Sequence, residues 1–352
     1  MERTALVIGA TGGIGSETAA ALLARGWKVR ALHRRPEEAA KTSIDPRIEW
    51  VAGDAMDAAS VVAAARGASV IVHGANPPGY RNWKGLVLPM LDNTIAAARA
   101  VGARVVLPGT VYNFGPEVLP RVGETAEQRP RTRKGAIRVE MEQHLRDSGV
   151  PALVVRAGDY FGARAKNSWF SQGIVTPGRS VRWLAYPAKA SVGHAWAYLP
   201  DVARTIALLL DRASELEPFA VFHFRGHWFD RGIALPEAVR RVTGALGAWI
   251  VPFPWFLVYL LAPFIETFRE MIEMRWLWKK PLELVNDKLV AFLGEEPHTP
   301  LDEALGETLR GLGCLPLARQ GERPPMILFP SASVSTSLPS SFSRTTRSTH
   351  QS

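Results

Sequence analysis

Val-Ile-Gly-Ala-Thr-Gly-Gly-Ile-Gly, residues 7–15 of this 352-residue chain, is the stretch most informative about its fold. The apolar run 5–8 predicts a buried strand before the glycines, and the Ala/Leu-rich run 16–25 predicts a helix after them. Backbone N–H groups and the positive end of such a helix favour a diphosphate. The stretch therefore predicts a dinucleotide-binding turn. The alternative is a glycine-rich strand–helix turn that binds nothing.

The end of the next predicted strand, 28–32, indicates which dinucleotide is bound. It runs into His33, Arg34 and Arg35, where an NAD-binding protein places an acid on the ribose 2′-hydroxyl. Two guanidinium groups can instead pair with a 2′-phosphate. We therefore expect NADP(H) to be favoured over NAD(H), the alternative being a solvated basic turn before Pro36.

Composition sets limits on size, compartment and partners. The chain is long enough for one large or two modest domains, and 47% of its residues are hydrophobic. Its one cysteine, Cys314, excludes an internal disulfide and a cysteine-based zinc site, so we expect a cytoplasmic protein. We expect no metal, a small-molecule substrate, and a homodimer as a candidate assembly.

The net charge of +9 is spread along the chain and does not predict nucleic-acid binding. Residues 319–352 contribute four arginines against one glutamate, and the other clear cluster is 129–134. Since aromatic residues are not interleaved with a basic stripe, we expect no nucleic-acid partner.

Alternating strands and helices predict an α/β fold, a Rossmann-type doubly wound parallel sheet with a smaller C-terminal substrate lobe. The further strands are expected at 48–51, 70–73, 104–107, 152–155 and 221–224. The further helices are expected at 57–66, 88–101, 132–148 and 201–211. We assign residues 1–163 to the NADP-binding domain, with 201–226 returning to it. The substrate lobe comprises 164–200 and 227–315, and we expect the Ser/Thr-rich tail 319–352 to be disordered.

The uncharged segment 242–265 is long enough to span a bilayer, but Pro252, Pro254 and Pro263 interrupt it. We expect it to pack against its own lobe as an apolar lid or core helix. Peripheral membrane contact and a true span are the less favoured alternatives.

Beyond the glycine turn, several segments resemble the extended short-chain dehydrogenase/reductases, in the branch of NAD-dependent epimerase/dehydratase-like proteins. They are Gly53-Asp54, Val70 to Ala75, Asn93, Leu107 to Gly115 and Arg156 to Gly162. The resemblance implies Asp54 as an adenine contact and Asn93 as a structural residue. The cofactor-binding residues expected from the turn and the resemblance are Gly9, Thr11, Gly12, Gly13, Ile14, Gly15, His33, Arg34, Arg35, Asp54, Gly74, Ala75 and Arg138.

The resemblance fails at the catalytic pair of that family, Tyr-x-x-x-Lys. On the helix predicted at 132–148, Lys134 stands at the tyrosine position and Arg138 at the lysine position. Arg138 can hold a ribose hydroxyl but cannot act as an acid or base; the alternative is a helix pair with Glu142. Lys134 is a candidate acid or base. We favour a solvated basic cluster with Arg131 and Arg133, which keeps its pKa high.

Three other side chains are candidates for the chemistry. Thr110 is expected to bind a substrate carbonyl, and Tyr160 or Tyr112 to donate the proton in place of the family tyrosine. His194, Trp196 and Trp169 are expected in the substrate lobe. The leading hypothesis is an NADP(H)-dependent oxidoreductase with an atypical acid/base group. The alternatives are a nucleotide-sugar epimerase or dehydratase and a non-catalytic NADP(H) sensor.

Replacing both Arg34 and Arg35 by glutamine should remove most of the preference for NADP(H). Each charge-assisted contact to the 2′-phosphate should contribute about 1.5–3 kcal/mol. Titration of the parent and the variant with both cofactors measures the change. Equal affinity of the parent for NADP(H) and NAD(H) would contradict the assignment.

Overall fold

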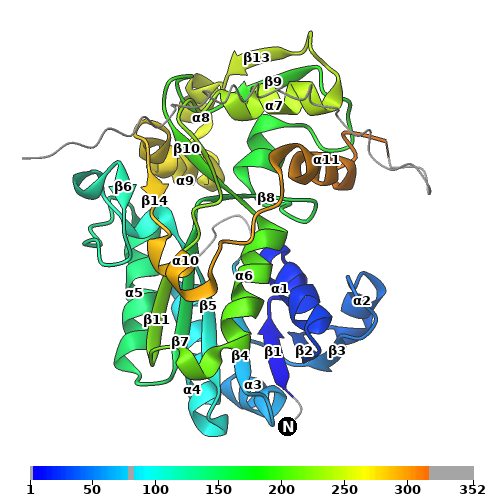
Figure 1. The fold of residues 1–352 in the computed structure, drawn as a ribbon, viewed down its shortest axis with the longest axis vertical. Helices are drawn as coiled ribbons and strands as arrows, with labels where there is room; N and C mark the ends of the chain where they lie inside the picture. Colours follow the sequence, from blue (N-terminus) through cyan, green and yellow to red (C-terminus); the bar gives the residue numbers. More distant parts are fainter. Residues whose placement is uncertain (1–2, 78–82, 317–352) are drawn as a thin grey trace, which may run out of the picture. The chain divides into compact units, whose positions relative to one another are not determined.

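A seven-stranded parallel sheet forms the centre of the structure, a computed structural model that describes residues 3–77 and 83–316. In spatial order the strands are β11 (Phe219–His223), β7 (Ala152–Ala157), β5 (Arg104–Thr110), β4 (Val70–His73), β1 (Thr4–Ile8), β2 (Lys28–His33) and β3 (Glu49–Ala52). They all run in the same direction, and the glycine turn follows β1, which lies between β4 and β2 inside the sheet (Figure 1). The expected tail 319–352 lies outside the described residues.

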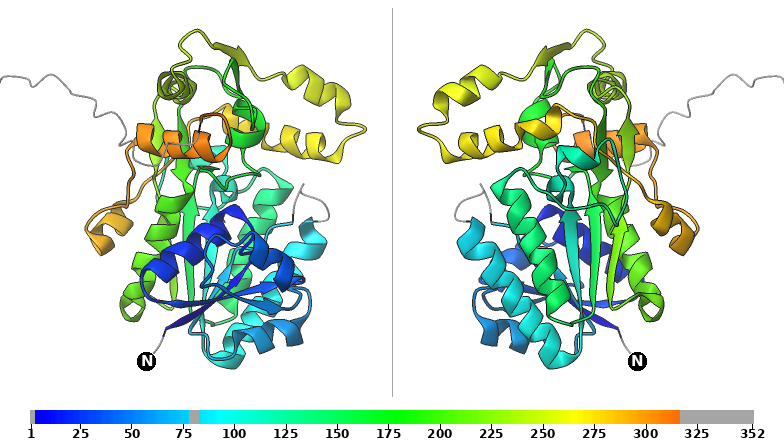
Figure 2. Two further views of the ribbon diagram at one scale, coloured as in Figure 1. Left: turned by 90° about the vertical axis from the view of Figure 1, so that its right-hand side faces the viewer. Right: turned by 90° about the vertical axis from the view of Figure 1, so that its left-hand side faces the viewer.

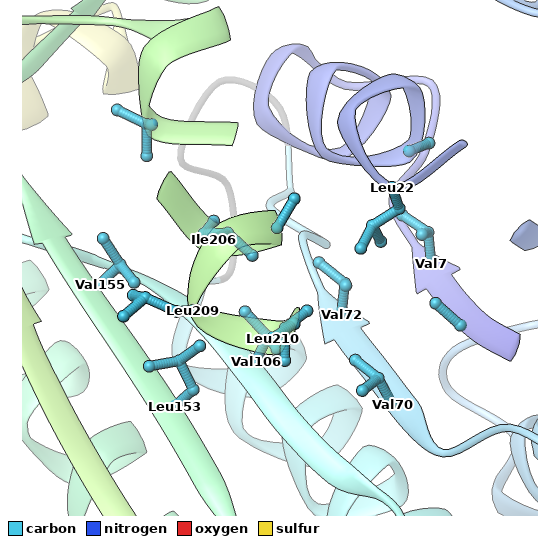
Figure 3. Packing of buried hydrophobic residues seen from close by; sticks show 14 of the residues in the cluster. Val7, Leu22, Val70, Val72, Val106, Leu153, Val155, Ile206, Leu209 and Leu210 are labelled. Carbon is cyan, nitrogen blue, oxygen red and sulfur yellow. The ribbon is translucent and has the colours of Figure 1, made fainter. Parts of the chain in front are cut away.

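Helices cover both faces of this sheet, which is why β4 and β7 are buried along their whole length. One face packs against α1 (Gly13–Ala24) and α6 (Leu199–Asp211), whose Leu22, Ile206 and Leu210 meet strand valines (Figure 3). The other face packs against α3 (Ala58–Ala65), α4 (Trp83–Val101) and α5 (Arg133–Asp147). The short helix α2 (Pro36–Lys41) follows β2.

The doubly wound parallel sheet predicted from the sequence is confirmed. Each predicted strand of the sheet occurs, within two residues at the amino end. β5 continues to Thr110, three residues beyond the predicted end at 107, because it stays paired with β7 up to Ala157. This extension places Thr110 at the carboxyl edge of the sheet, where the connecting loops meet.

Smaller sheets and helices lie beyond the carboxyl ends of the central strands (Figure 1). Their strands are β6 (Arg121–Val122), β8 (Asp159–Phe161), β9 (Trp183–Tyr186), β10 (His194–Tyr198), β12 (His227–Phe229), β13 (Trp249–Pro252) and β14 (Glu283–Leu284). Their helices are α7 (Ala234–Thr243), α8 (Trp255–Leu261), α9 (Glu266–Met274) and α11 (Leu301–Gly311), whereas α10 (Asp287–Leu293) packs beside β11 of the central sheet. Aromatic side chains fill the core here, among them Phe161, Phe170, Trp196 and Trp278.

The uncharged segment 242–265 packs less completely than its sequence predicts. It forms β13 and the short α8, of which Trp255, Val258 and Ala262 are buried. The opposite face of α8 is exposed, so the expectation of a core helix is wrong for that face. Among the described residues, no helix is both long and apolar enough to cross a bilayer.

A buried ion pair joins the central sheet to α5. Arg156 on β7 donates to both carboxylate oxygens of Glu142, at 3.0 and 2.5 Å. Asn113 and Gln128 donate to the same carboxylate, at 2.9 and 3.0 Å. Each oxygen of this buried carboxylate therefore accepts two hydrogen bonds. Glu142 thus pairs with Arg156, and the role of Arg138 stays a prediction.

Replacing Arg156 by leucine should lower the free energy of unfolding by about 3–5 kcal/mol, because Glu142 would remain buried without its counter-charge. Chemical denaturation measures the loss. The matched control is Arg129→Leu, which breaks an exposed ion pair with Glu127 and should change stability little. If the two substitutions lower the free energy of unfolding equally, the loss does not depend on burial of the ion pair.

Candidate active site

The glycine turn brings three backbone segments into contact at the end of β1. Gly9 has φ of +84°, and a Cβ there would lie 2.6 Å from the carbonyl carbon of Gly74. A Cβ on Gly15 would overlap the carbonyl oxygen of Gly9. At Gly12 a Cβ would meet only that oxygen, at 3.3 Å, because the other side of Gly12 is open. Gly9 and Gly15 are therefore needed for packing, and Gly12 for access to the cleft.

The first turn of α1 supplies backbone donors to this cleft. Gly12 is its N-cap residue and offers no side chain to satisfy them, so the N–H groups are available to an anion. The cleft holds about 300 Å³. Of the predicted cofactor residues it is lined by Gly9, Thr11, Gly12, Gly13, Ile14, Gly74, Ala75 and Arg138.

Basic and polar side chains that the sequence interpretation missed form the opposite wall. Arg164 and Lys166 lie in the loop after β8, and Asn167 and Ser168 follow them. Arg164 also pairs with Glu17 on α1 at 3.3 Å, which fixes the loop across the glycine turn. Arg164 and Lys166 belong to the stretch that we assign to the substrate lobe from the sequence, and their position directly after the segment Arg156 to Gly162 was the available signal.

His73 at the end of β4 faces the same cleft and was also missed as a site residue. Its Nδ1 lies 2.8 Å from the Thr94 hydroxyl, which itself donates to the Met90 carbonyl. Nδ1 therefore carries the proton, and Nε2 is left as an acceptor. Burial and the nearby Arg138 lower the pKa of His73 to about 3, so the ring is neutral.

The residues expected at the adenosine end lie beside β2 and β3, outside the lining of this cleft. Arg34 and Arg35 are exposed, and Arg35 pairs with Glu38 at 3.0 Å. Asp54 accepts a hydrogen bond from the backbone of Met56 at 3.0 Å. Asn93 donates to the Ala55 carbonyl at 2.9 Å and so supports the same loop. The roles of His33, Arg34, Arg35 and Asp54 toward a cofactor stay predictions.

A second cavity of about 300 Å³ adjoins the cleft, and Thr110, Tyr160, Asn167 and Ser168 line both. Its remaining wall is largely apolar and comes from the substrate lobe. The apolar side chains are Trp169, Phe253, Phe268, Met271 and Met274. Its ionisable side chains are Tyr112, Lys134, Asp159, Tyr160 and Glu270. A dinucleotide site and an apolar chamber thus meet at Thr110 and Tyr160.

Lys134 corrects the sequence interpretation most clearly. We predicted a solvated side chain with a high pKa, but Lys134 is 2% exposed and faces the apolar cavity. Its Nζ lies 3.0 Å from the Glu270 carboxylate on α9 and 3.3 Å from the Glu270 carbonyl oxygen. Burial lowers the pKa of Lys134, and Glu270 opposes that shift. No local pattern in the sequence predicts that α9 covers the start of α5.

Tyr160, Tyr112 and Thr110 all line the cavity, and their predicted roles in the chemistry stay predictions. Burial raises the pKa of Tyr160 to about 12, and its hydroxyl has no hydrogen-bond partner among the described residues. The Thr110 hydroxyl accepts from the backbone of Tyr112 at 3.2 Å. A raised pKa makes the Tyr160 hydroxyl a weaker proton donor near neutral pH.

The other lobe residues have structural contacts. Trp169 lines the cavity, whereas Trp196 is buried in the aromatic core. His194 stacks on Trp278 with ring centroids 4.0 Å apart and contacts Asp159 at 2.8 Å. Among residues 3–77 and 83–316, no three metal-binding side chains cluster as a metal site would require.

A Tyr-x-x-x-Lys spacing does occur elsewhere, from Tyr80 to Lys84, and the sequence interpretation overlooked it. It precedes most of α4 and is not on α5, where the family pair belongs. Tyr80 lies outside the described residues.

Comparisons with known proteins agree with this geometry. A family described as NAD(P)H-binding matches residues 9–167. The solved structure of gox2253 is similar over 90% of this chain and 100% of its own, with 22% identity and a TM-score of 0.68. WbmH from Bordetella bronchiseptica, in complex with NAD+, covers 88% and 98%, with 19% identity and a TM-score of 0.64.

A UDP-glucuronic acid 4-epimerase from Bacillus cereus, in complex with NAD, also covers 88% of this chain and 98% of its own. Its identity is 14% and its TM-score 0.66. At such identities the likeness shows the fold. No curated protein matches the chain.

Gly12→Val should abolish binding of either dinucleotide while leaving the protein folded, because the side chain would enter the space that the diphosphate needs. Gly123→Val is the control, since nothing lies within 4 Å of a Cβ there. Fluorescence titration with NADPH and NADH, beside a thermal melt, measures both effects. If a folded Gly12→Val protein binds the dinucleotides with unchanged affinity, the cleft is not the dinucleotide site.

Proposed function

We propose that the chain is an NADP(H)-dependent oxidoreductase acting on an apolar carbonyl or hydroxyl compound. The proposal is supported by the match of residues 9–167 to an NAD(P)H-binding family and by the fold that the chain shares with epimerases. One observation carries the proposal. The cofactor cleft and the apolar cavity meet at Thr110 and Tyr160, so a substrate in the cavity lies beside the inner end of the cleft.

The cleft fits a dinucleotide through its backbone and its cations. The open side of Gly12 and the first turn of α1 suit the diphosphate, and Arg138 at the inner end suits a ribose hydroxyl. Arg34 and Arg35 at the end of β2 suit a 2′-phosphate, which supports NADP(H). A bound nicotinamide would supply or accept the hydride.

The cavity supports an apolar substrate more than a nucleotide sugar. Aromatic and methionine side chains form most of its wall. A nucleotide diphosphate needs cations, but Lys134 is the one cationic side chain in the described lining and is already paired with Glu270. Some structural neighbours are nucleotide-sugar epimerases, and this difference in the cavity separates the present chain from that activity.

Lys134 is the side chain we assign as proton donor and acceptor, in place of the tyrosines favoured from the sequence alone. It occupies the helix position that the family gives to tyrosine and faces the cavity beside Thr110. Its buried ammonium has a lowered pKa, which brings it closer to the range useful for acid–base catalysis. Thr110 would orient the substrate oxygen by a hydrogen bond.

The assignment of Lys134 as proton donor and acceptor determines in which direction the turnover rate changes with pH. Reduction of a carbonyl needs the protonated ammonium of Lys134 as donor. Turnover in that direction should therefore hold at low pH and fall as the pH rises through the lowered pKa of Lys134. Oxidation of an alcohol needs the neutral amine, and its rate should rise over the same interval.

Lys134→Met should reduce turnover by about 100-fold or more and leave cofactor affinity close to the parent value. The measurement follows NADPH absorbance with a panel of aliphatic and aromatic aldehydes and ketones, beside cofactor titration and a thermal melt. The matched comparisons are Tyr160→Phe, Tyr112→Phe and Tyr80→Phe. Each should reduce turnover by less than Lys134→Met does. The alkaline loss of activity should disappear in the residual rate of Lys134→Met.

Two results would contradict the assignment. A large loss in one tyrosine variant with Lys134→Met still active would move the donor role to that tyrosine. Tight NADPH binding by a folded parent that turns over no member of the panel would favour the sensor.

A further inference from the structure

The outward face of α8 and of the turn after it is strongly apolar. We call this the α8 surface and define it as Phe256, Leu257, Leu260, Leu261, Phe264 and Ile265. Phe264 is 84% exposed, Phe256 71% and Leu260 66%. Such a run of large apolar side chains on one small helix and turn is uncommon on a protein that needs no partner there.

The exposure does not come from a loose segment, because the inward face of α8 is fixed. Trp255 and Val258 are buried, and the Trp255 indole donates to the Pro187 carbonyl at 2.9 Å. Helix α9 lies alongside α8, and the two form a hairpin that projects from the substrate lobe (Figure 2). Glu270 of α9 holds the hairpin to Lys134, so the α8 surface is presented outward from a packed element.

Cations border the α8 surface. Arg269 donates to the Pro263 carbonyl at 3.3 Å, and Arg275 donates to the Tyr259 hydroxyl at 3.0 Å while lying over the Trp255 ring. Neither has a carboxylate within ion-pair distance in the part of the chain described. Of the three acids on α9, Glu270 and Glu273 are engaged with Arg133, and Glu266 at the start of the helix is exposed.

We propose that the α8 surface docks on an anionic lipid bilayer, with the apolar side chains entering the interface and the arginines meeting lipid phosphates. Aromatic and aliphatic residues on one face with arginine at the border are the chemistry of an interfacial helix. A second copy of this chain fits less well, because a two-fold contact would bring the same cationic border against itself. The hairpin is too short to span the bilayer, so it lies on the surface.

The same hairpin forms part of the wall of the apolar cavity. Phe268 and Met271 of α9 line the cavity, whereas the α8 surface faces away from the lobe. Docking therefore brings the cavity close to the lipid, which suits a substrate that partitions into membranes. This consequence rests on the proposed function, but the docking itself does not.

Sedimentation of the full chain with vesicles tests the docking without any turnover. The parent should bind vesicles containing phosphatidylglycerol and bind pure phosphatidylcholine more weakly. Phe256→Ser with Phe264→Ser should lower the partition coefficient by about 10-fold or more. Val290→Ser on α10, where the valine is 37% exposed, is the matched control and should bind as the parent does. Arg269→Gln should reduce the preference for the anionic lipid.

Folding and self-association are measured on the same proteins by thermal melting, NADPH titration and light scattering. The double variant should keep the parent melt and cofactor affinity, because both phenylalanines are exposed. The proposal is overturned if the parent does not bind anionic vesicles, or if the double variant binds them equally well. If the parent is a dimer, does not bind vesicles, and becomes monomeric in the double variant, the α8 surface is an interface with a second copy of the chain instead. If the parent binds vesicles but shows no turnover, the docking proposal stands and only the proposed function is contradicted.

Discussion

The ion pair between Arg156 and Glu142 is the constraint on which the site depends. It ties β7 to the middle of α5 and, through Asn113 and Gln128, to the loops that follow β5. Because a buried charge is tolerated only when its partners stay in place, these elements cannot shift independently. Thr110 at the end of β5 and Lys134 at the start of α5, which both line the apolar cavity, are therefore attached to one frame.

A second charged contact gives the substrate lobe its position over this frame. Glu270 on α9 pairs with Lys134 and with Arg133 at the start of α5. Burial under α9 lowers the pKa of Lys134, the Glu270 carboxylate opposes that shift, and Glu270 with its helix forms one wall of the apolar cavity. One helical hairpin thus influences the electrostatics of the site through α9 and presents the apolar α8 surface on its other side.

The sequence interpretation succeeded where the signal was local and failed where it was not. The glycine spacing identified the cleft because Gly9 and Gly15 are required by contacts within one strand–turn–helix unit. The exposure of Lys134 was predicted wrongly because its neighbours Arg131 and Arg133 suggested a solvated basic cluster. Its burial comes from α9, more than 130 residues later in the chain. The face of α8 was misjudged for the related reason that hydrophobicity alone does not say which side of a helix is covered.

The parallel sheet, the positions of its strands along the chain and the glycine turn at the cleft could all be predicted from the sequence. These follow from hydrophobic runs, helix periods and glycines at fixed spacing, all of which act over short distances along the chain. The tertiary structure alone decided that Lys134 faces an apolar cavity, that Arg164 and Lys166 line the cleft, and that one face of α8 stays exposed. Those properties depend on which distant segments pack together, and burial and pKa are set by that packing rather than by neighbours in sequence.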